Sequence, residues 1–574
     1  MEERNFAVVN HETPRLESID KATGLGKYTD DLSMPNMAYA ALVRSPHSHA
    51  KVLGIDTSEA EKIPGYLGCA LPEESPQEYF NCSGNPPSPL LMADEKVLTD
   101  EPLVLGDRVA IVAAETEAAA RAAAEAVKVE YEIIAPMLDV KSALAPNAPA
   151  LQPHIAPNNI VQRREVSQGD IAEGEAKSDI IVEDHFVTPP MQHTMIELTC
   201  CICDFSDGKH LTIYSCSQTV FQERRILAEI FGIKEVDVHI IKPLVGAGFG
   251  ARQQLHAQHA AALISRKVGR PIKLLYSREE EFYSVVRHAS DVDLRIGVDK
   301  NGKMQFFDTT FRLNAGPYTT HTPTVVAAAA RKLQYNVPNY SFVGLSVFTN
   351  HVTGGAFRGY GNTQLTFGRE ILMDRLAQRL NMDPVEFRLM NHVQVGQCFP
   401  CASIPVSSNG IEECARRCRQ LQKEIDEKEP LVDNDEIRQA WGIAFSCHGS
   451  GPSSKEGLSG AVIMLNADAT VHLLVGSADI GQGSETMECQ IAAECLGIPL
   501  SNVQITAADT RLTPYNTGTF GSSQTFICGN AVKLACDDLK QKMIEQLRLI
   551  YPDCKVEETV SYTHLRAHET CADL

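Results

Sequence analysis

Alternating apolar and polar positions predict a small mixed domain near the start of the chain. Ala38 to Arg44 and Arg108 to Ala113 are short apolar runs, and Lys128 to Ile134 alternates, as strands do. Glu115 to Val127 is rich in alanine and predicts a helix between two of these strands. The pattern therefore indicates an α+β fold, which we place at residues 15–140.

A segment with repeated Pro, Ala and Asn predicts a linker at residues 141–160. The next region, 161–395, has its clearest unit near the middle. There a β-rich run from Val236 to Val245 leads into a glycine-rich turn, Gly246 to Gly250, and then into an amphipathic helix from Gln253 to Val268.

A polar helical stretch, Glu412 to Glu427, opens a third region, which we place at residues 410–559. A chain of 574 residues is too long for one compact core, so several domains are expected.

Composition narrows the function further. The formal net charge of −21 argues against a site that must neutralise many nucleic-acid phosphates. The first ten residues are acidic and polar rather than basic and apolar, and no apolar stretch is long enough to span a bilayer. We therefore expect a cytoplasmic protein with no nucleic-acid or membrane partner.

The chain has 17 cysteines, which are dilute at this length, and we expect free thiols rather than a disulfide scaffold. Cys398 and Cys401 have the spacing of a metal-binding pair. No second pair of that form lies nearby, so free thiols are favoured over a metal site.

Four glycine-rich segments carry the candidate chemistry: residues 246–250, 354–364, 476–484 and 516–524. Each glycine weakens a regular helix or strand, and such loops let the backbone approach a ligand closely. The first segment does not fit the dinucleotide pattern, because Ala251 stands where its third glycine is needed. Together they predict one extended polyanionic ligand held by backbone and amide hydrogen bonds.

In this order, the segments resemble the large subunit of the xanthine dehydrogenase and aldehyde oxidase family of molybdenum hydroxylases. The resemblance runs from about Thr23 to Thr559 and includes Arg44-Ser-Pro-His-Ser-His49. It implies an α+β fold: a small α/β hammerhead-type domain followed by two elongated mixed α+β molybdenum-cofactor-binding domains, the second of them incomplete.

The resemblance also implies roles for individual residues. Gln218 and Arg358 match residues that face the metal, which is held through the pterin and has no protein ligand. The implied cofactor-binding residues are Gln218, Gly248, Phe249, Gly250, Arg358, Gly481, Gln482, Gly483, Gly521, Ser522 and Ser523. From the residues alone, Gln218 as the cap of a strand end and Arg358 as a solvated charge stay open as alternatives.

For the substrate, the resemblance implies that Tyr360 and Phe445 sandwich a flat ring, although Phe445 as plain core stays open. Gln253 occupies the position where animal xanthine oxidases carry a substrate-binding glutamate, and Val326 a position where they carry an arginine. An amide still hydrogen-bonds a polar heterocycle. For Glu197, a structural ion pair and a catalytic role both stay open.

The implied reaction is hydroxylation of a purine-like aromatic heterocycle with water as the oxygen source. The implied cofactor is molybdopterin, with its cytosine dinucleotide form as an alternative. The family's basic glutamate lies in a later loop than this sequence contains, and residues 560–574 resemble translated adapter DNA, so we expect the 574 residues alone not to turn over.

Electrons must leave the site, and the chain has neither a four-cysteine iron–sulfur motif nor a flavin fingerprint. Partner subunits carrying [2Fe-2S] and FAD are implied, assembled as a dimer of heterotrimers. An aldehyde or nicotinate-type hydroxylase subunit and a non-catalytic cofactor-binding subunit are the competing hypotheses.

Overall fold

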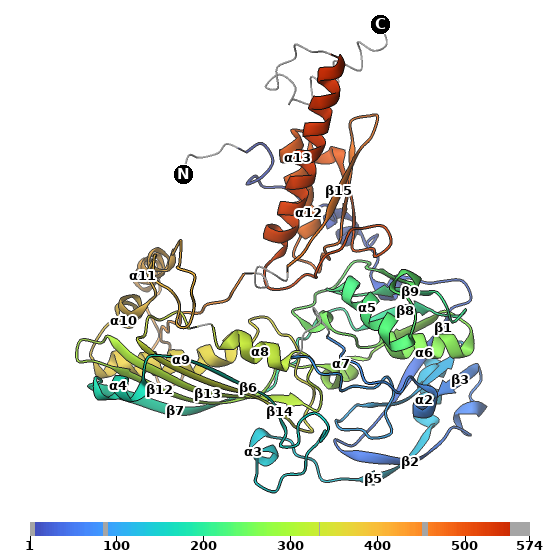
Figure 1. The fold of residues 1–574 in the computed structure, drawn as a ribbon, viewed down its shortest axis with the longest axis horizontal. Helices are drawn as coiled ribbons and strands as arrows, with labels where there is room; N and C mark the ends of the chain where they lie inside the picture. Colours follow the sequence, from blue (N-terminus) through green and yellow to red (C-terminus); the bar gives the residue numbers. More distant parts are fainter. Residues whose placement is uncertain (1–5, 84–89, 332, 451–456, 551–574) are drawn as a thin grey trace. The chain divides into compact units, whose positions relative to one another are not determined.

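The computed structural model describes residues 6–83, 90–331, 333–450 and 457–550. Its contacts divide the chain into two compact units (Figure 1). Unit 1 comprises Met1–Pro136, Gln192–Val285 and Ser450–Leu574, and unit 2 comprises Met137–Met191 and Val286–Gly449. Residues of the 161–395 region thus belong to both units.

The main element of unit 1 is a mixed seven-stranded sheet. Its strands in spatial order are β10 (Val238–Ile241), β9 (Leu211–Ser215), β8 (Cys200–Asp204), β11 (Ile272–Leu275), β1 (Ala38–Arg44), β4 (Arg108–Ala114) and β3 (Tyr66–Ala70). The first two segments of unit 1, Met1–Pro136 and Gln192–Val285, contain the helices α1 (Ser18–Thr23), α2 (Glu117–Ala126), α5 (Val220–Phe231), α6 (Gln258–Val268) and α7 (Arg278–Ser284). A separate two-stranded sheet pairs β2 (Ala50–Asp56) with β5 (Lys128–Ile133).

Apolar burial explains why the strands of this sheet form where they do. Six of the seven residues of β4 are buried, and β1 pairs antiparallel with β4 and parallel with β11. Helix α6 buries eight successive residues, Gln258 to Ser265. The strands expected at residues 38–44, 108–113 and 128–134 and the helix expected at 115–127 are confirmed, to within two residues at each end.

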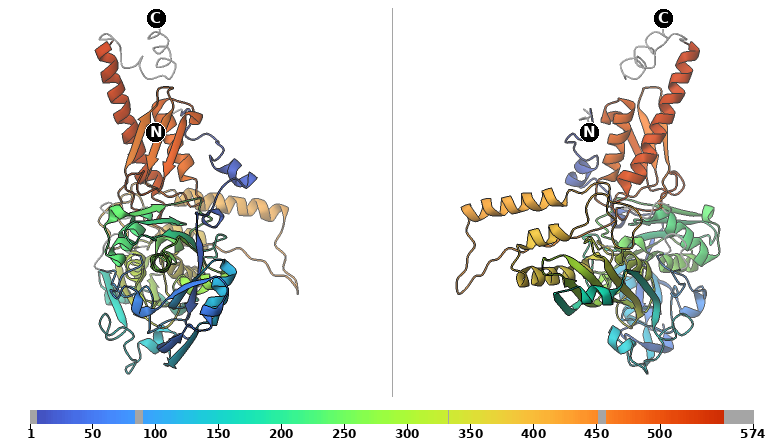
Figure 2. Two further views of the ribbon diagram at one scale, coloured as in Figure 1. Left: turned by 90° about the vertical axis from the view of Figure 1, so that its right-hand side faces the viewer. Right: turned by 60° about the vertical axis from the view of Figure 1, so that its left-hand side comes forward.

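The last part of unit 1 is a three-stranded sheet, β15 (Ala461–Leu465), β16 (Val471–Val475) and β17 (Val503–Ala507), with helices α12 (Ser484–Leu496) and α13 (Gln524–Ile550). Figure 2 shows both helices beside the strands, and Val471, Leu473 and Val475 share one apolar cluster with Cys528 and Val532.

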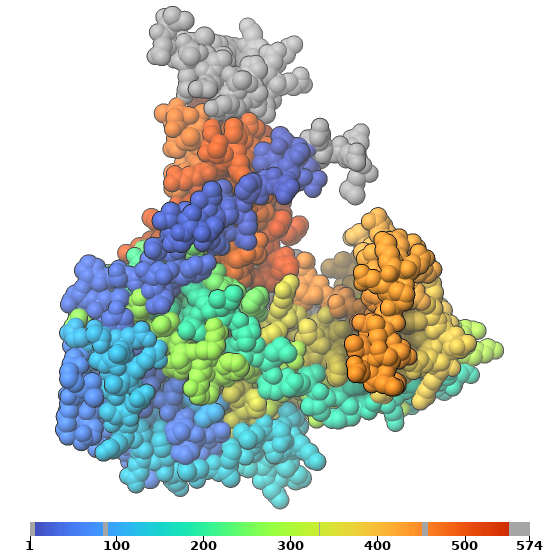
Figure 3. Space-filling model, turned by 180° about the vertical axis from the view of Figure 1, so that it is seen from behind, coloured from blue at the N-terminus to red at the C-terminus, as the bar shows by residue number. Residues whose placement is uncertain are grey.

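The first described residues, from Phe6 on, lie over this part of unit 1, where Figure 3 shows them in dark blue. The backbone N–H groups of Ala7, Val8 and Val9 donate to the carboxylate of Glu494 on α12. Three donors on one carboxylate anchor this segment.

Unit 2 is built on a five-stranded sheet in the order β6 (Ile160–Gln168), β14 (Asn339–Phe348), β13 (Met304–Gly316), β12 (Ser290–Val298) and β7 (Ile180–Thr188). Only β13 and β14 pair parallel. Its helices are α3 (Val140–Ala143), α4 (Ile171–Ala176), α8 (Thr322–Ala329), α9 (Asn362–Arg379), α10 (Pro384–Asn391) and α11 (Ile411–Lys428). The helix expected at 412–427 is therefore confirmed as α11.

Two expected boundaries are wrong. The helix expected from Gln253 begins only at Gln258, because Gln253 ends a short 3-10 turn, Ala251–Gln253, and the extended backbone of Gln254 separates that turn from α6. Strand β10 ends at Ile241 rather than Val245, two residues before a proline that has no N–H donor.

Every cysteine within the described ranges is a free thiol. Among the helices of those ranges, none combines the length and apolar character needed to cross a bilayer. The expected boundary at Thr559 and the tail 560–574 lie outside the described residues.

Candidate functional site

Gln218 joins two glycine-rich loops within unit 1. It follows strand β9 and is buried, with its Oε1 accepting from the Gly250 N–H at 3.1 Å and its Nε2 donating to the Thr519 carbonyl at 2.6 Å. The Thr519 N–H donates in turn to the Gln218 carbonyl at 2.9 Å. Loops that are some 30 and 300 residues away in sequence are therefore held against one amide.

Thr519 adds a third loop to this junction. Its hydroxyl donates to the Ala478 carbonyl at 2.7 Å and accepts from the Ala478 N–H at 3.1 Å. Sequence reasoning included Thr519 in a glycine-rich segment without giving it a role. The sequence offered one sign of its role, a threonine that follows a glycine, and this pattern is not specific. In the structure that glycine, Gly518, has a φ of 129°.

The loop from Gly246 to Gly250 approaches Gln218 closely. A Cβ at Gly248 would lie 2.4 Å from Oε1 of Gln218, so any side chain there would have to displace the Gln218 amide. Ala247, Phe249 and Gly250 all have positive φ, and Phe249 is exposed. This backbone is strained and open on one side, as expected where a ligand is received.

Glu197 holds the start of that loop. Its Oε2 accepts from the Gly246 N–H at 2.7 Å, and its carbonyl accepts from the buried Arg252 guanidinium at 2.8 Å. Burial raises the pKa of the Glu197 carboxyl, although the charge of Arg252 and the Gly246 N–H oppose the shift. These contacts favour the structural role for Glu197.

Glu223, five residues after Gln218, carries a buried carboxyl. Oε1 of Glu223, on helix α5, accepts from Ser215 Oγ at 3.1 Å and from Gln258 Nε2 at 2.8 Å. Burial raises the pKa of Glu223 to about 8, against the hydrogen bonds from Ser215, Ser217 and Gln258. Sequence reasoning missed this residue, since nothing in a helical Glu signals burial.

The loop containing Gln482 is closed by its own side chains. Asp479 accepts from the N–H groups of Gly481 (2.8 Å) and Glu485 (3.2 Å), and Gln482 accepts from the Ile480 N–H at 2.7 Å and donates to Ser484 Oγ at 2.9 Å. Gly481 and Gly483 are left-handed. The backbone thus turns tightly into α12 with Gln482 exposed.

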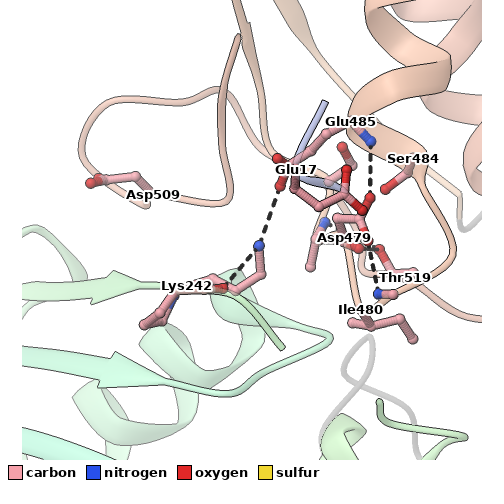
Figure 4. Close-up of polar contacts among 12 residues, drawn as sticks. Glu17, Lys242, Asp479, Ile480, Ser484, Glu485, Asp509 and Thr519 are labelled. Atoms are coloured by element: carbon pink, nitrogen blue, oxygen red, sulfur yellow. Dashed lines mark hydrogen bonds and ion pairs between the residues drawn. The ribbon is translucent and has the colours of Figure 1, made fainter. Parts of the chain in front are cut away.

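Lys242 links this loop to the end of strand β10, as Figure 4 shows. Its ammonium lies 3.3 Å from the Glu485 carboxylate and donates to the Pro243 carbonyl at 3.1 Å, while its side chain is 3% exposed. Removing the carboxylate would leave the buried Lys242 ammonium without a compensating charge, which would lower the stability of the fold.

In the last glycine-rich loop, Gly521 and Ser522 are left-handed, and Ser522 is exposed. Ser523 is buried and its hydroxyl donates to the Phe520 carbonyl at 2.7 Å. The free hydroxyl on this loop surface is thus that of Ser522.

Three of the expected residues belong to unit 2. Arg358 is exposed. The hydroxyl of Tyr360 lies 2.6 Å from Thr324 Oγ1 and 3.0 Å from Nδ1 of His321, and the Phe445 ring packs edge-on against His392 at 6.1 Å between centroids. Tyr360 and Phe445 pack into the same apolar cluster.

Gln253, in unit 1, is buried, and its side-chain amide makes no hydrogen bond to another described residue. Val326, in unit 2, is fully buried, and its Cγ1 lies 2.4 Å from where a Cβ on Gly344 of β14 would stand. Val326 is therefore packed in the core, and its side chain contributes no polar group.

The residues present suit an extended polyanionic pterin. The three joined loops of unit 1 offer backbone turns too tight for a side chain, an exposed amide and an exposed hydroxyl. The described residues contain one group of side chains close enough to hold a metal directly, His185, Asp291 and Asp293, and Arg312 already pairs with both carboxylates at 2.8 and 2.7 Å. These loops therefore fit a metal held through the pterin.

Three family models match the chain. Residues 23–134 match the aldehyde oxidase and xanthine dehydrogenase a/b hammerhead domain, and residues 152–392 and 415–567 each match a molybdopterin cofactor-binding domain.

Curated relatives agree with these matches. The xanthine dehydrogenase molybdenum-binding subunit of Escherichia coli O157:H7 is 31% identical over 564 residues, which cover 96% of this chain and 74% of that protein. The nicotinate dehydrogenase large molybdopterin subunit of Eubacterium barkeri is 29% identical over 74% of this chain and 98% of its own length.

Among solved structures, the aldehyde oxidoreductase from Desulfovibrio gigas superposes with a TM-score of 0.86 at 29% identity, over 92% of this chain and 59% of that one. The α+β architecture expected from the resemblance, a hammerhead domain followed by two cofactor-binding domains, is confirmed. The chain belongs to the xanthine dehydrogenase and aldehyde oxidase family as a molybdopterin-binding large subunit of a molybdenum hydroxylase.

Proposed function

We propose that this subunit serves a cytoplasmic enzyme that hydroxylates a purine-like aromatic N-heterocycle with oxygen from water. The observation that carries the proposal is the junction at Gln218, where the loops of Gly250, Thr519 and Ala478 meet through buried hydrogen bonds. Preorganised polar loops of this kind position a cofactor at little cost at the moment of reaction.

The bound molybdopterin, or its cytosine dinucleotide form, would supply the redox chemistry of hydroxylation. The chain's own residues would bind and orient it: Gly248, Phe249 and Gly250 beside Gln218, Gly481, Gln482 and Gly483 before α12, and Gly521, Ser522 and Ser523 before α13. Gln218 would hold its place through the two bonds already made, and the family resemblance gives the Arg358 guanidinium a role toward the cofactor.

For the substrate, we propose that Tyr360 and Phe445 supply aromatic faces and Gln253 a polar anchor. The Gln253 side chain is buried and its amide makes no hydrogen bond to a described residue, which supports this role because the amide is not already committed to a protein partner. Both its donor and its acceptor remain available to a ring nitrogen or a carbonyl.

An aldehyde or nicotinate hydroxylase is the second candidate. Val326 favours it, since that position contributes no charge for a purine oxygen. The named relatives include an aldehyde oxidoreductase and a nicotinate dehydrogenase subunit. We also propose partner subunits with [2Fe-2S] and FAD, in a dimer of heterotrimers, because two electrons must leave the site at each turnover.

The experiment expresses two proteins, each with the neighbouring reading frames: the 574-residue chain, and an extended version in which native coding sequence follows Thr559. Molybdenum per chain and dye reduction with xanthine, nicotinate and benzaldehyde are measured. Xanthine-dependent reduction is expected from the extended protein. Bound molybdopterin with no reduction by any substrate would indicate a non-catalytic subunit.

A matched pair of variants tests the junction itself. Gln218→Leu removes both amide bonds, whereas Gln152→Leu removes a buried amide that donates to the Pro317 carbonyl at 2.6 Å in unit 2. Molybdenum content should fall in the first variant and not in the second. Equal content in both would contradict the cofactor site.

A further inference from the structure

The main chain of Phe445 is held on both sides by buried polar side chains of unit 2. Its N–H donates to Oε2 of Glu370 at 3.0 Å. Its carbonyl accepts from Nε2 of Gln334 at 2.8 Å and from the guanidinium of Arg369 at 3.2 Å. A single residue thus has both backbone groups bound to side chains that lie 75 to 111 positions away.

This clamp acts on one residue of an otherwise exposed segment. Ala444 and Ser446, on either side, are exposed, and no helix or strand is assigned between Glu429 and Gly449. Phe445 is buried and packs against His392. The clamp therefore holds the aromatic residue directly, and Ile443, two residues earlier, packs against the same apolar cluster.

The residues behind the clamp form a buried ion network. Glu370 accepts from Arg369 Nε at 3.0 Å, Arg388 Nε at 2.8 Å and the Tyr335 hydroxyl at 3.0 Å. Buried ion networks often add little net stability compared with apolar packing, because desolvation offsets the attraction between the charges. Stability alone is thus a poor reason for this arrangement.

Gln334 also has a buried arrangement that stability alone does not explain. It is 1% exposed, and while its Nε2 bonds to the Phe445 carbonyl, its Oε1 has no partner among the described residues. A buried carbonyl oxygen without a partner costs free energy. A methionine would fill nearly the same space without that cost, so what the amide contributes is its bond to Phe445.

We propose that Gln334 and Glu370 are positioning residues that fix the Phe445 ring and thereby set a preference for flat aromatic substrates. The inference rests on the proposed function, in which Phe445 is one face of the substrate site. Neither residue needs to touch the substrate: each acts through the backbone of Phe445.

The chain contains its own reporter for this segment. Trp441 is the only tryptophan and lies four residues before Phe445. It is 48% exposed, and its indole N–H donates to Asp426 at 2.7 Å. Quenching of its fluorescence by acrylamide reports how firmly the segment is held and needs no turnover.

The experiment compares Gln334→Met with Gln152→Met in the holoenzyme assembled with the extended protein. Both changes remove a buried amide that donates to a carbonyl of unit 2, but Gln152 donates to Pro317 instead of Phe445. For Gln334→Met, Trp441 quenching should rise. KM for xanthine should increase by about two- to tenfold, the worth of one hydrogen bond. Its kcat and the KM for an aliphatic aldehyde should stay unchanged, as should all values for Gln152→Met.

Unchanged quenching and unchanged KM in Gln334→Met would overturn the inference, and so would equal losses for flat and aliphatic substrates. Glu370→Gln is the second variant. It should likewise raise KM for xanthine and leave KM for an aliphatic aldehyde unchanged, and it should also lower the melting temperature. If the wild-type holoenzyme shows no turnover, the proposed function fails. The quenching ratio of the two methionine variants then still decides whether Gln334 anchors the segment.

Discussion

Stability of unit 1 should fall as pH rises toward 8, and Glu223 is the reason. The side chain is 2% exposed, and its Oε2 has no partner among the described residues. Burial raises its pKa to about 8, against the hydrogen bonds from Ser215, Ser217 and Gln258. The folded protein thus holds a protonated acid at neutral pH, while the unfolded chain has ionised it.

The sign and the size follow from linkage. A carboxyl whose folded pKa is raised contributes stability that is fully present below its unfolded pKa, near 4.3, and is lost as pH rises through the folded value. Each unit of difference is worth about 1.4 kcal/mol, so the loss between pH 4 and pH 9 is on the order of 5 kcal/mol at most. It is concentrated between pH 5 and pH 8.

The assay is the thermal midpoint followed by circular dichroism from pH 5 to pH 9. Glu223→Gln imitates the protonated acid, so its midpoint should exceed that of the wild type increasingly as pH rises. At about 2 °C or less per kcal/mol for a unit of this size, the difference should grow by roughly 5 °C.

The assay compares the thermal midpoints of two proteins because Glu488, in the same unit, also has a pKa raised by burial, to about 7. Its effect on stability is present in both proteins and cancels in the difference. Glu229→Gln, at an exposed position of the same helix, is the control and should leave the pH profile parallel to the wild type. Parallel profiles for Glu223→Gln would refute the reasoning.

Three further predictions concern the substrate site. Phe445→Ala should weaken flat heterocycles by roughly 0.5–1.5 kcal/mol beyond the lost area, measured as KM, and an equal loss for aliphatic aldehydes would count against stacking. Gln253→Glu should reorder xanthine, nicotinate and benzaldehyde by kcat/KM at constant molybdenum content, and loss of molybdenum would refute its role. Tyr360→Phe removes the contacts to Thr324 and His321 and should lower stability by about 1 kcal/mol in urea titrations, whereas no change would mean that the hydroxyl contributes nothing.

The pattern of apolar and polar residues was enough to predict some of the helices and strands. Strand β4 is apolar at nearly every position because both faces are covered, whereas α11 is a polar, largely exposed helix with one buried residue, Ala415. Strand β13 was not anticipated, although Met304 to Gly316 alternates buried and partly buried positions over much of its length. Its polar residues Asp308 and Arg312 occupy partly buried positions, so the alternation is present in the sequence.

The candidate site was predictable only as far as its glycines. Gly248 and Gly518 mark loops at which a side chain would collide with Gln218 or Thr219. The partners of those loops depend on tertiary packing, and no spacing in the sequence connects Gln218 with Thr519. The same holds for Gln334 and Glu370, which meet only at the backbone of Phe445.

Four of the nine described residues that have positive φ without being glycine or asparagine lie in the glycine-rich segments. They are Ala247, Phe249, Tyr360 and Ser522. Each such residue costs on the order of 1 kcal/mol and persists only where its surroundings hold it. Around Ala247 and Phe249, Glu197 holds the Gly246 N–H and Gln218 the Gly250 N–H, one at each end of the loop. The residues between these anchors are therefore kept in a conformation that packing does not require, which is the state expected of a loop preorganised for its ligand.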